Sequence, residues 1–422
     1  MRGKLLLPRR SVLPWDDRRE AGASRDRVPK LKLGYETNSS ACTFTPTQET
    51  PLQTMNRADT ELSRLVAEHG SPLVTISRRT LTENLRRLEA ALPGIRMHYA
   101  VKANPQREIL DALAKAGSRF DIASLGELAR VSEFEDDPRS ILYTNPIKAF
   151  PEIKKAHEAG IDTFFYDNLS ELDKIAQAAP GARVMLRLGV DNPNCVVDLG
   201  AKFGCPHDEA ESLLLAALER GLDARGLCFH VGSQTSIPVP YLQMAVVCRA
   251  LFNKMALAGH PLRTLDIGGG FPVSYKTPMM DVEDFCKPIR ETLGGYFPNT
   301  EIIAEPGRAI SASAATLVTR VIGKSRRRGI TWYYLDDGLY GTLSGLVFDK
   351  TNYAFDCLKT GNREPCVLAG PTCDSFDVIS RDEFLPPLEI GDSIIVRNVG
   401  AYATATATAF NDVPAAKVLV VE

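Results

Sequence analysis

The sequence predicts an α/β protein, with a (β/α)8 TIM-like barrel followed by a smaller C-terminal domain of the β-sandwich or β-barrel kind. Short β-branched or apolar runs alternate with amphipathic helical patterns from about residue 80 to about residue 311. This stretch of roughly 230 residues is close to the usual barrel length of about 250 residues. After about residue 312 the helical patterns give way to strands and turns.

The barrel strands are expected where the apolar runs recur. There are eight such runs, at Met97–Val101, Phe120–Ala123, Ile141–Tyr143, Thr163–Tyr166, Val184–Leu188, Leu227–His230, Thr264–Ile267 and Ile302–Ala304. Amphipathic segments such as REILDALAKAGS (107–118) and DEAESLLLAALERGL (208–222) lie between them. Their apolar residues fall at i, i+3, i+4 and i+7, and glycines stand where a helix would end.

The remaining segments complete the predicted domain organisation. Strands of the C-terminal domain are expected in TLVTRVIGKS (316–325), TWYYLDDG (331–338), PCVLAGP (365–371), DSIIVRNVGAY (392–402) and AKVLVVE (416–422). We expect a disordered leader over 1–55, an N-terminal segment over 56–80 that joins the β domain through PLVTISRR (72–79), the barrel over 81–311 and the β domain over 312–422. The leader has no apolar core typical of a signal peptide, and Met55 is an alternative start.

Composition narrows the class of partner. The chain has 422 residues, 44% of them hydrophobic, and a formal net charge of −2, so no basic field favours nucleic acid or an anionic membrane. No run approaches the roughly 18 apolar residues of a membrane-spanning helix. Nine cysteines without a CxxC pair and six histidines without zinc-ligand spacing favour a reduced, cytoplasmic protein with no metal site. A small-molecule partner is expected.

Unusual polar residues coincide with the predicted strand ends, where enzymes with this fold carry their chemistry. They are Lys102 after the first strand, Asp121 and Ser124 after the second, Arg187 near the end of the fifth, His230 and Ser233 after the sixth, Gly268, Gly269 and Gly270 after the seventh, and Glu305 and Arg308 after the eighth.

Each of these residues also has an interpretation without function. Lys102 by itself is more simply a solvated lysine whose stem covers apolar surface, although a desolvated lysine forms Schiff bases. The Gly268–Gly270 run lacks GxGxxG spacing, which argues against NAD, and is either a tight turn or a phosphate cradle completed by Arg308. Glu305 pairs with Arg308 or with a pyridinium nitrogen, and His230 is a buried histidine or a stacking partner.

Seven motifs in order carry a family resemblance: YAVKAN, FDIASLGEL, CFHVGSQ, DIGGGF, AEPGR, GPTCDSFD and GAYATATATAFN. With them, residues 60 to 422 resemble the group IV, fold-type III pyridoxal-phosphate (PLP) decarboxylases of basic amino acids, in particular their ornithine decarboxylase branch. The resemblance implies an alanine racemase-like fold, a role in polyamine biosynthesis and pyridoxal 5′-phosphate as cofactor.

The resemblance also implies roles for matching residues. Lys102 would bind the cofactor as a Schiff base, Glu305 would pair with its pyridinium nitrogen and His230 would stack on its ring. Gly307 and residues at the phosphate would complete the cofactor site, while Glu127 would support Lys102 and the ring's surroundings together with Asp121 and Arg187. The phosphate residues would be Ser233, Gly268, Gly269, Gly270, Arg308 and Tyr402.

Substrate residues follow from the same resemblance. Cys373 would return a proton to the α-carbon, and Asp374 and Asp349 would bind the distal ammonium of the substrate. In the family the loop that carries Cys373 reaches the partner subunit's cofactor, which implies a homodimer with shared sites. From the residues alone, a lone cysteine such as Cys373 is more often a small buried apolar side chain, and Asp349 can also be a solvated loop acid.

The expected reaction is decarboxylation of L-ornithine to putrescine, with lysine as the alternative because one methylene is worth only about 1–3 kcal/mol. Cys373-Asp374-Ser375 replaces the Cys-Glu-Ser typical of diaminopimelate decarboxylases. Arginine decarboxylases of this fold are expected to be longer chains. A fold-III racemase would pair the pyridine nitrogen with arginine rather than Glu305. A non-catalytic protein like the antizyme inhibitors would have lost cofactor contacts that remain here.

Overall fold

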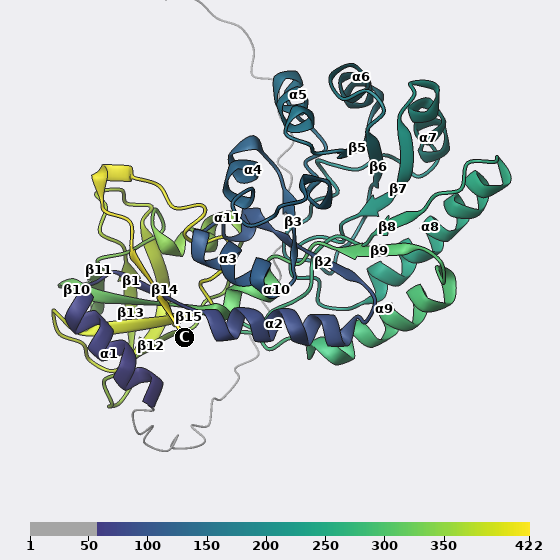
Figure 1. Cartoon of the computed structure of the whole chain (residues 1–422). Coiled ribbons are helices and arrows are strands. Elements are labelled where there is room, and N and C mark those ends of the chain that lie inside the picture. The colour runs from purple at the N-terminus through teal and green to yellow at the C-terminus, as the bar shows by residue number, and fades with distance from the viewer. Residues whose placement is uncertain (1–56) are drawn as a thin grey trace, which may run out of the picture. The chain divides into compact units, whose positions relative to one another are not determined.

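The computed structural model describes residues 57–422, with side chains from residue 60 (Figure 1). The predicted leader over 1–55 and the alternative start at Met55 lie outside the described residues.

Eight parallel strands close into a barrel in which β2 pairs with both β3 and β9. The strands are β2 (Arg96–Ala100), β3 (Arg119–Ile122), β4 (Leu142–Tyr143), β5 (Thr163–Tyr166), β6 (Arg183–Leu188), β7 (Asp223–Phe229), β8 (Thr264–Asp266) and β9 (Glu301–Ala304). Each overlaps one of the predicted runs, which confirms the predicted fold class. Val101 was expected in a strand but begins the 3₁₀ helix η1 (Val101–Ala103), because the chain turns immediately after Ala100.

Helices alternate with the barrel strands and surround them (Figure 1). They are α2 (Arg78–Ala91), α3 (Arg107–Lys115), α4 (Leu125–Val131), α5 (Phe150–Glu158), α6 (Leu169–Ala178), α7 (Ala210–Glu219), α8 (Val239–Leu257), α9 (Val282–Tyr296) and α10 (Arg308–Ser311). In α3 the predicted apolar face is buried through Ile109, Leu110 and Leu113, and the chain leaves the helix at Gly117, whose φ is +93°. None of the helices within the described residues is both long enough and apolar enough to cross a membrane.

The β domain is a second sheet, with strand order β12-β15-β10-β11-β13-β14. Its strands are β10 (Ala315–Arg327), β11 (Ile330–Leu335), β12 (Phe355–Cys357), β13 (Glu364–Ala369), β14 (Val378–Leu385) and β15 (Ser393–Arg397), and the short helix α11 (Gly345–Phe348) lies between β11 and β12. β12 and β14 were not anticipated from the sequence. β12 has three residues, and β14 reads VISRDEFL, in which charged residues interrupt the apolar pattern.

The first and last strands of the described chain are neighbours. β1 (Leu73–Ser77) pairs antiparallel with β10 and parallel with β16 (Lys417–Val421). The preceding helix α1 (Arg57–His69) contributes Leu62, Leu65 and Val66 to an apolar cluster with residues of β1, β10 and β15. Figure 1 shows α1 beside this sheet, near the C-terminus. Segments from both ends of the described chain therefore build the β domain.

Candidate active site

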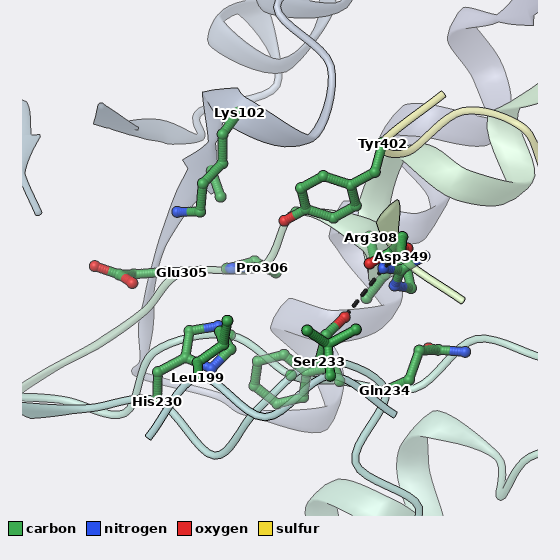
Figure 2. Close-up of a pocket in the computed structure, with 17 residues that line it drawn as sticks. Lys102, Leu199, His230, Ser233, Gln234, Glu305, Pro306, Arg308, Asp349 and Tyr402 are labelled. Atoms are coloured by element: carbon green, nitrogen blue, oxygen red, sulfur yellow. Dashed lines mark hydrogen bonds and ion pairs between the residues drawn. The ribbon is translucent and has the colours of Figure 1, made fainter. Parts of the chain in front are cut away.

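A cavity of about 180 Å³ opens at the carboxyl ends of the barrel strands (Figure 2). Its walls come from both domains, because Lys102 and Glu305 follow barrel strands whereas Asp349 and Tyr402 belong to the β domain. The lining residues are Ala100, Lys102, Val197, Leu199, His230, Ser233, Gln234, Gly269, Gly270, Phe271, Glu305, Pro306, Gly307, Arg308, Ala309, Asp349 and Tyr402. The two domains thus share one site.

Lys102 reaches into this cavity from η1, the single turn that follows β2. Its Nζ donates a 2.7 Å hydrogen bond to Oδ2 of Asp121, which is buried on the neighbouring strand β3. Burial lowers the pKa of the Lys102 amine, but the carboxylates of Asp121 and Glu305 raise it by more, so the net pKa lies above that of an ordinary lysine. The amine is held as a cation with a proton acceptor beside it.

Glu305 follows β9, and its side chain is buried in the cavity wall. Burial raises the pKa of this carboxyl well above its usual range, and Asp121 and Asp266 add to the shift. Its Oε1 has no hydrogen-bond partner among the described residues. Because buried polar atoms normally find partners, this orphan oxygen suits a ligand that brings a cationic N–H donor.

Asp266 was not anticipated as a site residue, although it opens the DIGGGF motif. It ends β8, the strand that pairs with β9, and lies next to Glu305, which follows β9; burial also raises the pKa of Asp266. Its Oδ1 accepts the N–H of Gly268 at 2.7 Å. Two buried carboxyl groups thus influence each other at this side of the cavity, and their proximity disfavours ionising both.

His230 lines the cavity directly after β7. The N–H of Gly232 donates to Nδ1 at 3.1 Å, so the proton of the neutral ring is on Nε2. Burial lowers the pKa of His230, and the charges of Arg187 and Lys102 lower it further. In the view of Figure 2, Lys102 and His230 lie on either side of Glu305. A neutral, flat imidazole is therefore available to contact a planar ring.

The other end of the cavity is positively charged through Arg308, the first residue of α10. Its guanidinium donates to Ser233 Oγ at 3.0 Å and to the hydroxyl of Tyr275 at 3.0 Å, and it forms an ion pair with Asp349. The ring centroid of Tyr402 lies 5.0 Å from Arg308 Cζ. Nε of Arg308 is buried without a partner among the described residues. This orphan donor suits a bound anion.

The Gly268–Gly270 run passes too close to its neighbours for other residues. A Cβ on Gly269 would lie 2.6 Å from the carbonyl oxygen of Glu305, and one on Gly270 would lie 2.5 Å from that of Gly232. Gly270 also has a φ of +114°. Gly268 lies behind the cavity rather than in its lining, whereas Gly307 lines it. The glycines therefore bring the backbone against the cavity.

Several residues implied by the resemblance surround the site without lining it. Asp121 lies behind Lys102, and Arg187 lies over the ring of Phe203 with its Cζ 5.2 Å from the centroid. At the start of α4, Ser124 caps the helix because its Oγ accepts from Glu127 N at 3.2 Å, and Glu127 Oε2 accepts from Ala123 N at 2.6 Å. The contacts of these residues therefore hold the backbone and the side chains next to the cavity in place.

Cys373 and Asp374 do not line the cavity of their own chain. They lie on the loop between β13 and β14, where Cys373 is exposed. The hydroxyl of Tyr340 donates to Asp374, which lowers the pKa of that carboxyl. Phe376, in the same loop, is 59% exposed. The fold of a single chain thus keeps this loop apart from Lys102.

Sequence reasoning missed part of the lining. Val197 and Leu199 come from the loop after β6 and carry no polar group, so the sequence offered no signal for them. Gln234 stands in the CFHVGSQ motif and Tyr275 lies four residues beyond Phe271, in the segment after the glycines. Tyr275 contacts Arg308 only because the fold brings these two segments together.

These features fit pyridoxal phosphate. The cavity combines an amine for its aldehyde, a buried carboxyl with an orphan oxygen for its ring nitrogen, and an arginine with an orphan Nε for its phosphate. Lys102, Glu305 and Arg308 supply these three groups, and a neutral His230 supplies a flat surface for the ring.

Known proteins share this sequence and structure. The chain is 40% identical over 355 residues, 84% of its length and 90% of the relative's, to a lysine/ornithine decarboxylase of Selenomonas ruminantium. A crystal structure of an SrLDC mutant in complex with PLP matches with a TM-score of 0.84 and 39% identity, covering 87% of this chain and 96% of that one. A lysine/ornithine decarboxylase of Vibrio vulnificus complexed with putrescine matches with a TM-score of 0.83 and 38% identity, covering 87% and 99% of the two chains.

One match corrects an expectation. Arginine decarboxylases were expected to be longer chains, yet that of Paramecium bursaria Chlorella virus aligns over 100% of its length with 86% of this chain, at 30% identity and a TM-score of 0.82. Chain length therefore does not argue against an arginine substrate.

A family model defines the relationship. Residues 78–312 match the pyridoxal-binding domain of the pyridoxal-dependent decarboxylases, which covers β2 to β9 and the helices between them. Together with identity to relatives along most of the chain, this match shows that the chain belongs to the fold-type III, PLP-dependent decarboxylases of basic amino acids, which are carboxy-lyases.

Proposed function

We propose that this enzyme decarboxylates L-ornithine to putrescine, with L-lysine as a competing substrate that gives cadaverine. The observation that carries the proposal is that Asp349 lines the same cavity as Lys102 and Glu305. Its Oδ2 is engaged by Arg308 and Thr351, whereas Oδ1 accepts no hydrogen bond from the described residues. That oxygen is available for the distal ammonium of a diamino acid, which needs a charged partner when buried.

The proposed roles at the cofactor follow from the contacts in the cavity. When bound, pyridoxal phosphate supplies an electron sink for the charge left by the departing carboxylate. Lys102 would hold the cofactor covalently, and Asp121 would accept the proton that its amine must lose. Glu305 would hold a proton on the ring nitrogen, and His230 would cover one ring face. The phosphate would be bound by Ser233, Gly268, Gly269, Gly270, Gly307, Arg308 and Tyr402.

Neighbouring groups would support these contacts. Arg187 lowers the pKa of His230 and so helps to keep the imidazole neutral. Glu127 lies close enough to Asp121 and Lys102 for their charges to affect its pKa. We propose that both residues position the groups that touch the cofactor.

The remaining groups would come from a second copy of the chain. We propose that Cys373 protonates the α-carbon and that Asp374 joins Asp349 at the distal ammonium, both in the partner subunit's site. Support comes from the exposure of Cys373 and its absence from the cavity of its own chain. A two-fold homodimer would place two such loops at two cavities, since the same surface is used on both subunits.

We further propose a cytoplasmic location, since the eight cysteines in the described part are free thiols.

A product assay with the purified enzyme, added PLP and L-ornithine, L-lysine, L-arginine and diaminopimelate tests the substrate. Putrescine is expected as the main product, with kcat/KM for lysine lower by about 10- to 200-fold because the pocket must accommodate one more methylene. The D-isomers of ornithine and lysine complete the panel. A higher kcat/KM for lysine or arginine would overturn the assignment to ornithine.

Lys102→Ala tests the attachment of the cofactor. The variant should lose both turnover and the absorbance at about 420 nm expected of PLP bound to a lysine. Lys115→Ala, which removes an exposed lysine paired with Asp111, serves as the control and should behave like wild type. Decarboxylation by Lys102→Ala at the wild-type rate would end the proposed role.

Cys373→Ala tests the proton donor. Without it, protonation at the cofactor rather than at the α-carbon should increase, releasing an aldehyde after hydrolysis in place of part of the diamine. Chromatography of the products measures this partition, with Cys357→Ala as the matched control. Pure putrescine from Cys373→Ala would remove Cys373 from the reaction.

A further inference from the structure

A second cavity occupies the opposite end of the barrel, around the first residues of the strands. Its volume is about 230 Å³, larger than the catalytic cavity at about 180 Å³. No residue lines both cavities. Five arginines line it, namely Arg96, Arg119, Arg139, Arg183 and Arg225. Such a concentration of cations at one point requires compensation by anions.

Carboxylates compensate only part of this charge. Three of the arginines have acidic partners: Arg96 with Glu301 at 2.6 Å, Arg183 with Asp162 at 3.5 Å, and Arg225 with Asp223 at 3.9 Å. Within residues 57–422, Arg119 and Arg139 form no ion pair. Asp137 is the remaining acid of the lining, and it accepts the backbone N–H of Arg139 at 3.1 Å. Five arginines thus face four carboxylates, and two guanidinium groups are left for a ligand.

Two buried polar atoms of the lining also lack partners. His98 is 2% exposed and Ser140 is 3% exposed, and neither His98 Nε2 nor Ser140 Oγ has a hydrogen-bond partner among the described residues. His98 Nδ1 lies 3.4 Å from the carbonyl oxygen of Phe120, which only accepts, so Nδ1 carries the proton and Nε2 offers a lone pair. Burial lowers the pKa of His98 to about 3, and the charges of Arg119 and Arg96 add to this effect, so the ring is neutral. Orphan atoms of this kind indicate a bound polar molecule.

Four apolar side chains and two threonines, Thr163 and Thr264, form the rest of the lining. Leu142, Phe165, Met185 and Ile303 line the cavity, and together with Cys228 they form one apolar cluster. This cluster therefore sets the polar groups of this cavity apart from the catalytic residues at the other strand ends.

We propose that this cavity is a binding site for a phosphoryl group, either inorganic phosphate or the phosphate of a short monoester. Guanidinium groups match phosphate oxygens in a bidentate manner, and Ser140 adds a hydroxyl donor. Hydrogen phosphate, or the monoanion of a monoester, also carries an O–H that His98 Nε2 accepts, which sulfate and carboxylates lack at neutral pH. The volume of about 230 Å³ lies below the roughly 300–1,000 Å³ of sites for drug-sized ligands, so the ligand is small.

Calorimetric titration of the PLP-loaded enzyme with inorganic phosphate tests the proposal, because bound cofactor occupies the phosphate subsite at Arg308. One phosphate per chain should bind. Arg119→Gln and Arg139→Gln should each weaken binding about tenfold or more, since each removes a charge-assisted hydrogen bond. Arg381→Gln, which removes an exposed arginine from β14, should bind like wild type.

Two further titrations identify the ligand chemistry. Sulfate should bind more weakly than phosphate, since it has no proton for His98. Glycerol phosphate binding tighter than phosphate assigns a monoester, and weaker binding assigns inorganic phosphate. In the wild-type enzyme with ¹⁵N-labelled histidine, phosphate should shift the His98 signal among the six histidines, a readout that needs no variant of the arginines.

Several outcomes would overturn the proposal. In calorimetry, these are the absence of phosphate binding to the PLP-loaded enzyme and an equal loss of binding in Arg381→Gln and Arg119→Gln. In the other two measurements, they are sulfate binding as tight as phosphate binding and a His98 signal that does not change at saturating phosphate.

Discussion

His98 is a buried histidine that stays neutral in the folded protein. Burial, reinforced by the charges of Arg119 and Arg96, lowers its pKa from 6.5 to about 3. In the unfolded chain the ring titrates near pH 6.5, so between pH 6.5 and pH 3 the unfolded state binds more protons than the folded one. The contribution of His98 to stability is therefore present above pH 6.5 and is lost as the pH falls toward 3.

This linkage predicts a pH-dependent difference between wild type and His98→Gln, which has no titrating ring. From pH 7.5 to pH 5, the free energy of unfolding of wild type should fall by about 2 kcal/mol relative to the variant. Urea denaturation in phosphate-free buffers measures both profiles. Parallel profiles would show that His98 takes up its proton in the folded protein at the same pH as in the unfolded chain.

Asp349 has two partners at different oxygens, the guanidinium of Arg308 at Oδ2 and the proposed substrate ammonium at Oδ1. Asp349→Asn should raise KM for ornithine by about 10- to 150-fold, because a hydrogen bond to a charged group is worth about 1.5–3 kcal/mol. Affinity for PLP should not fall, because Arg308 keeps its charge and loses a competitor for the phosphate. Steady-state kinetics measure KM for ornithine, and PLP titration measures the affinity for the cofactor. Weaker PLP binding with unchanged KM would make Asp349 a structural partner of Arg308 alone.

At the scale of elements, the loop after β8 depends on backbone that passes close to its neighbours. Gly270 has a φ of +114°, and a Cβ there would lie 2.5 Å from the carbonyl oxygen of Gly232. Gly94 has a φ of +80° but no atom within 4 Å of such a Cβ. A side chain at Gly94 would therefore add backbone strain alone, whereas a side chain at Gly270 would add backbone strain and a steric clash.

Gly270→Ala should destabilise the enzyme by about 2 kcal/mol or more beyond Gly94→Ala, because a clash adds to the roughly 1–3 kcal/mol of backbone strain. Gly270→Ala should also bind PLP more weakly, since the loop must move at the cavity. Thermal unfolding and PLP titration of both variants measure the difference. Equal destabilisation by Gly270→Ala and Gly94→Ala would mean that the loop after β8 moves to accommodate the new Cβ without a further loss of stability.

At the scale of the whole molecule, the proposed site needs two chains. Lys102 lines one cavity of a chain, whereas Cys373 of the same chain lies outside it. In a two-fold dimer, mixing Lys102→Ala with Cys373→Ala would create dimers in which one of the two sites carries both intact residues.

Mixing these two variants in equal amounts should therefore give about a quarter of wild-type activity per chain from sites with both residues intact, in addition to the diamine that Cys373→Ala makes by itself, since half of the dimers are mixed and each has one intact site. Lys102→Ala mixed with Glu305→Ala is the control and should restore nothing, because both residues belong to the same chain's cavity. Diamine production after subunit exchange is the readout. Failure of the first pair to regain activity, once exchange is verified, would refute the shared site.

The sequence determined those features of this enzyme that depend on local pattern. The apolar runs located all eight barrel strands, because burial between helices and barrel interior demands apolar residues in succession. Strand ends pointed to Lys102, His230 and Glu305, because parallel strands present their carboxyl ends at one edge. β12 and β14 escaped prediction, since a three-residue strand and a charged strand at the edge of a sheet carry little periodic signal.

Only the tertiary structure decided which distant residues meet. Pairing of β8 with β9 brings Asp266 beside Glu305, and docking of the β domain brings Tyr402 and Asp349 to Arg308. The arginines at the opposite end of the barrel are far apart in the sequence and converge for the same reason. Local sequence specifies which residues are buried and in which kind of element, whereas the contacts between elements arise from packing them into one closed structure.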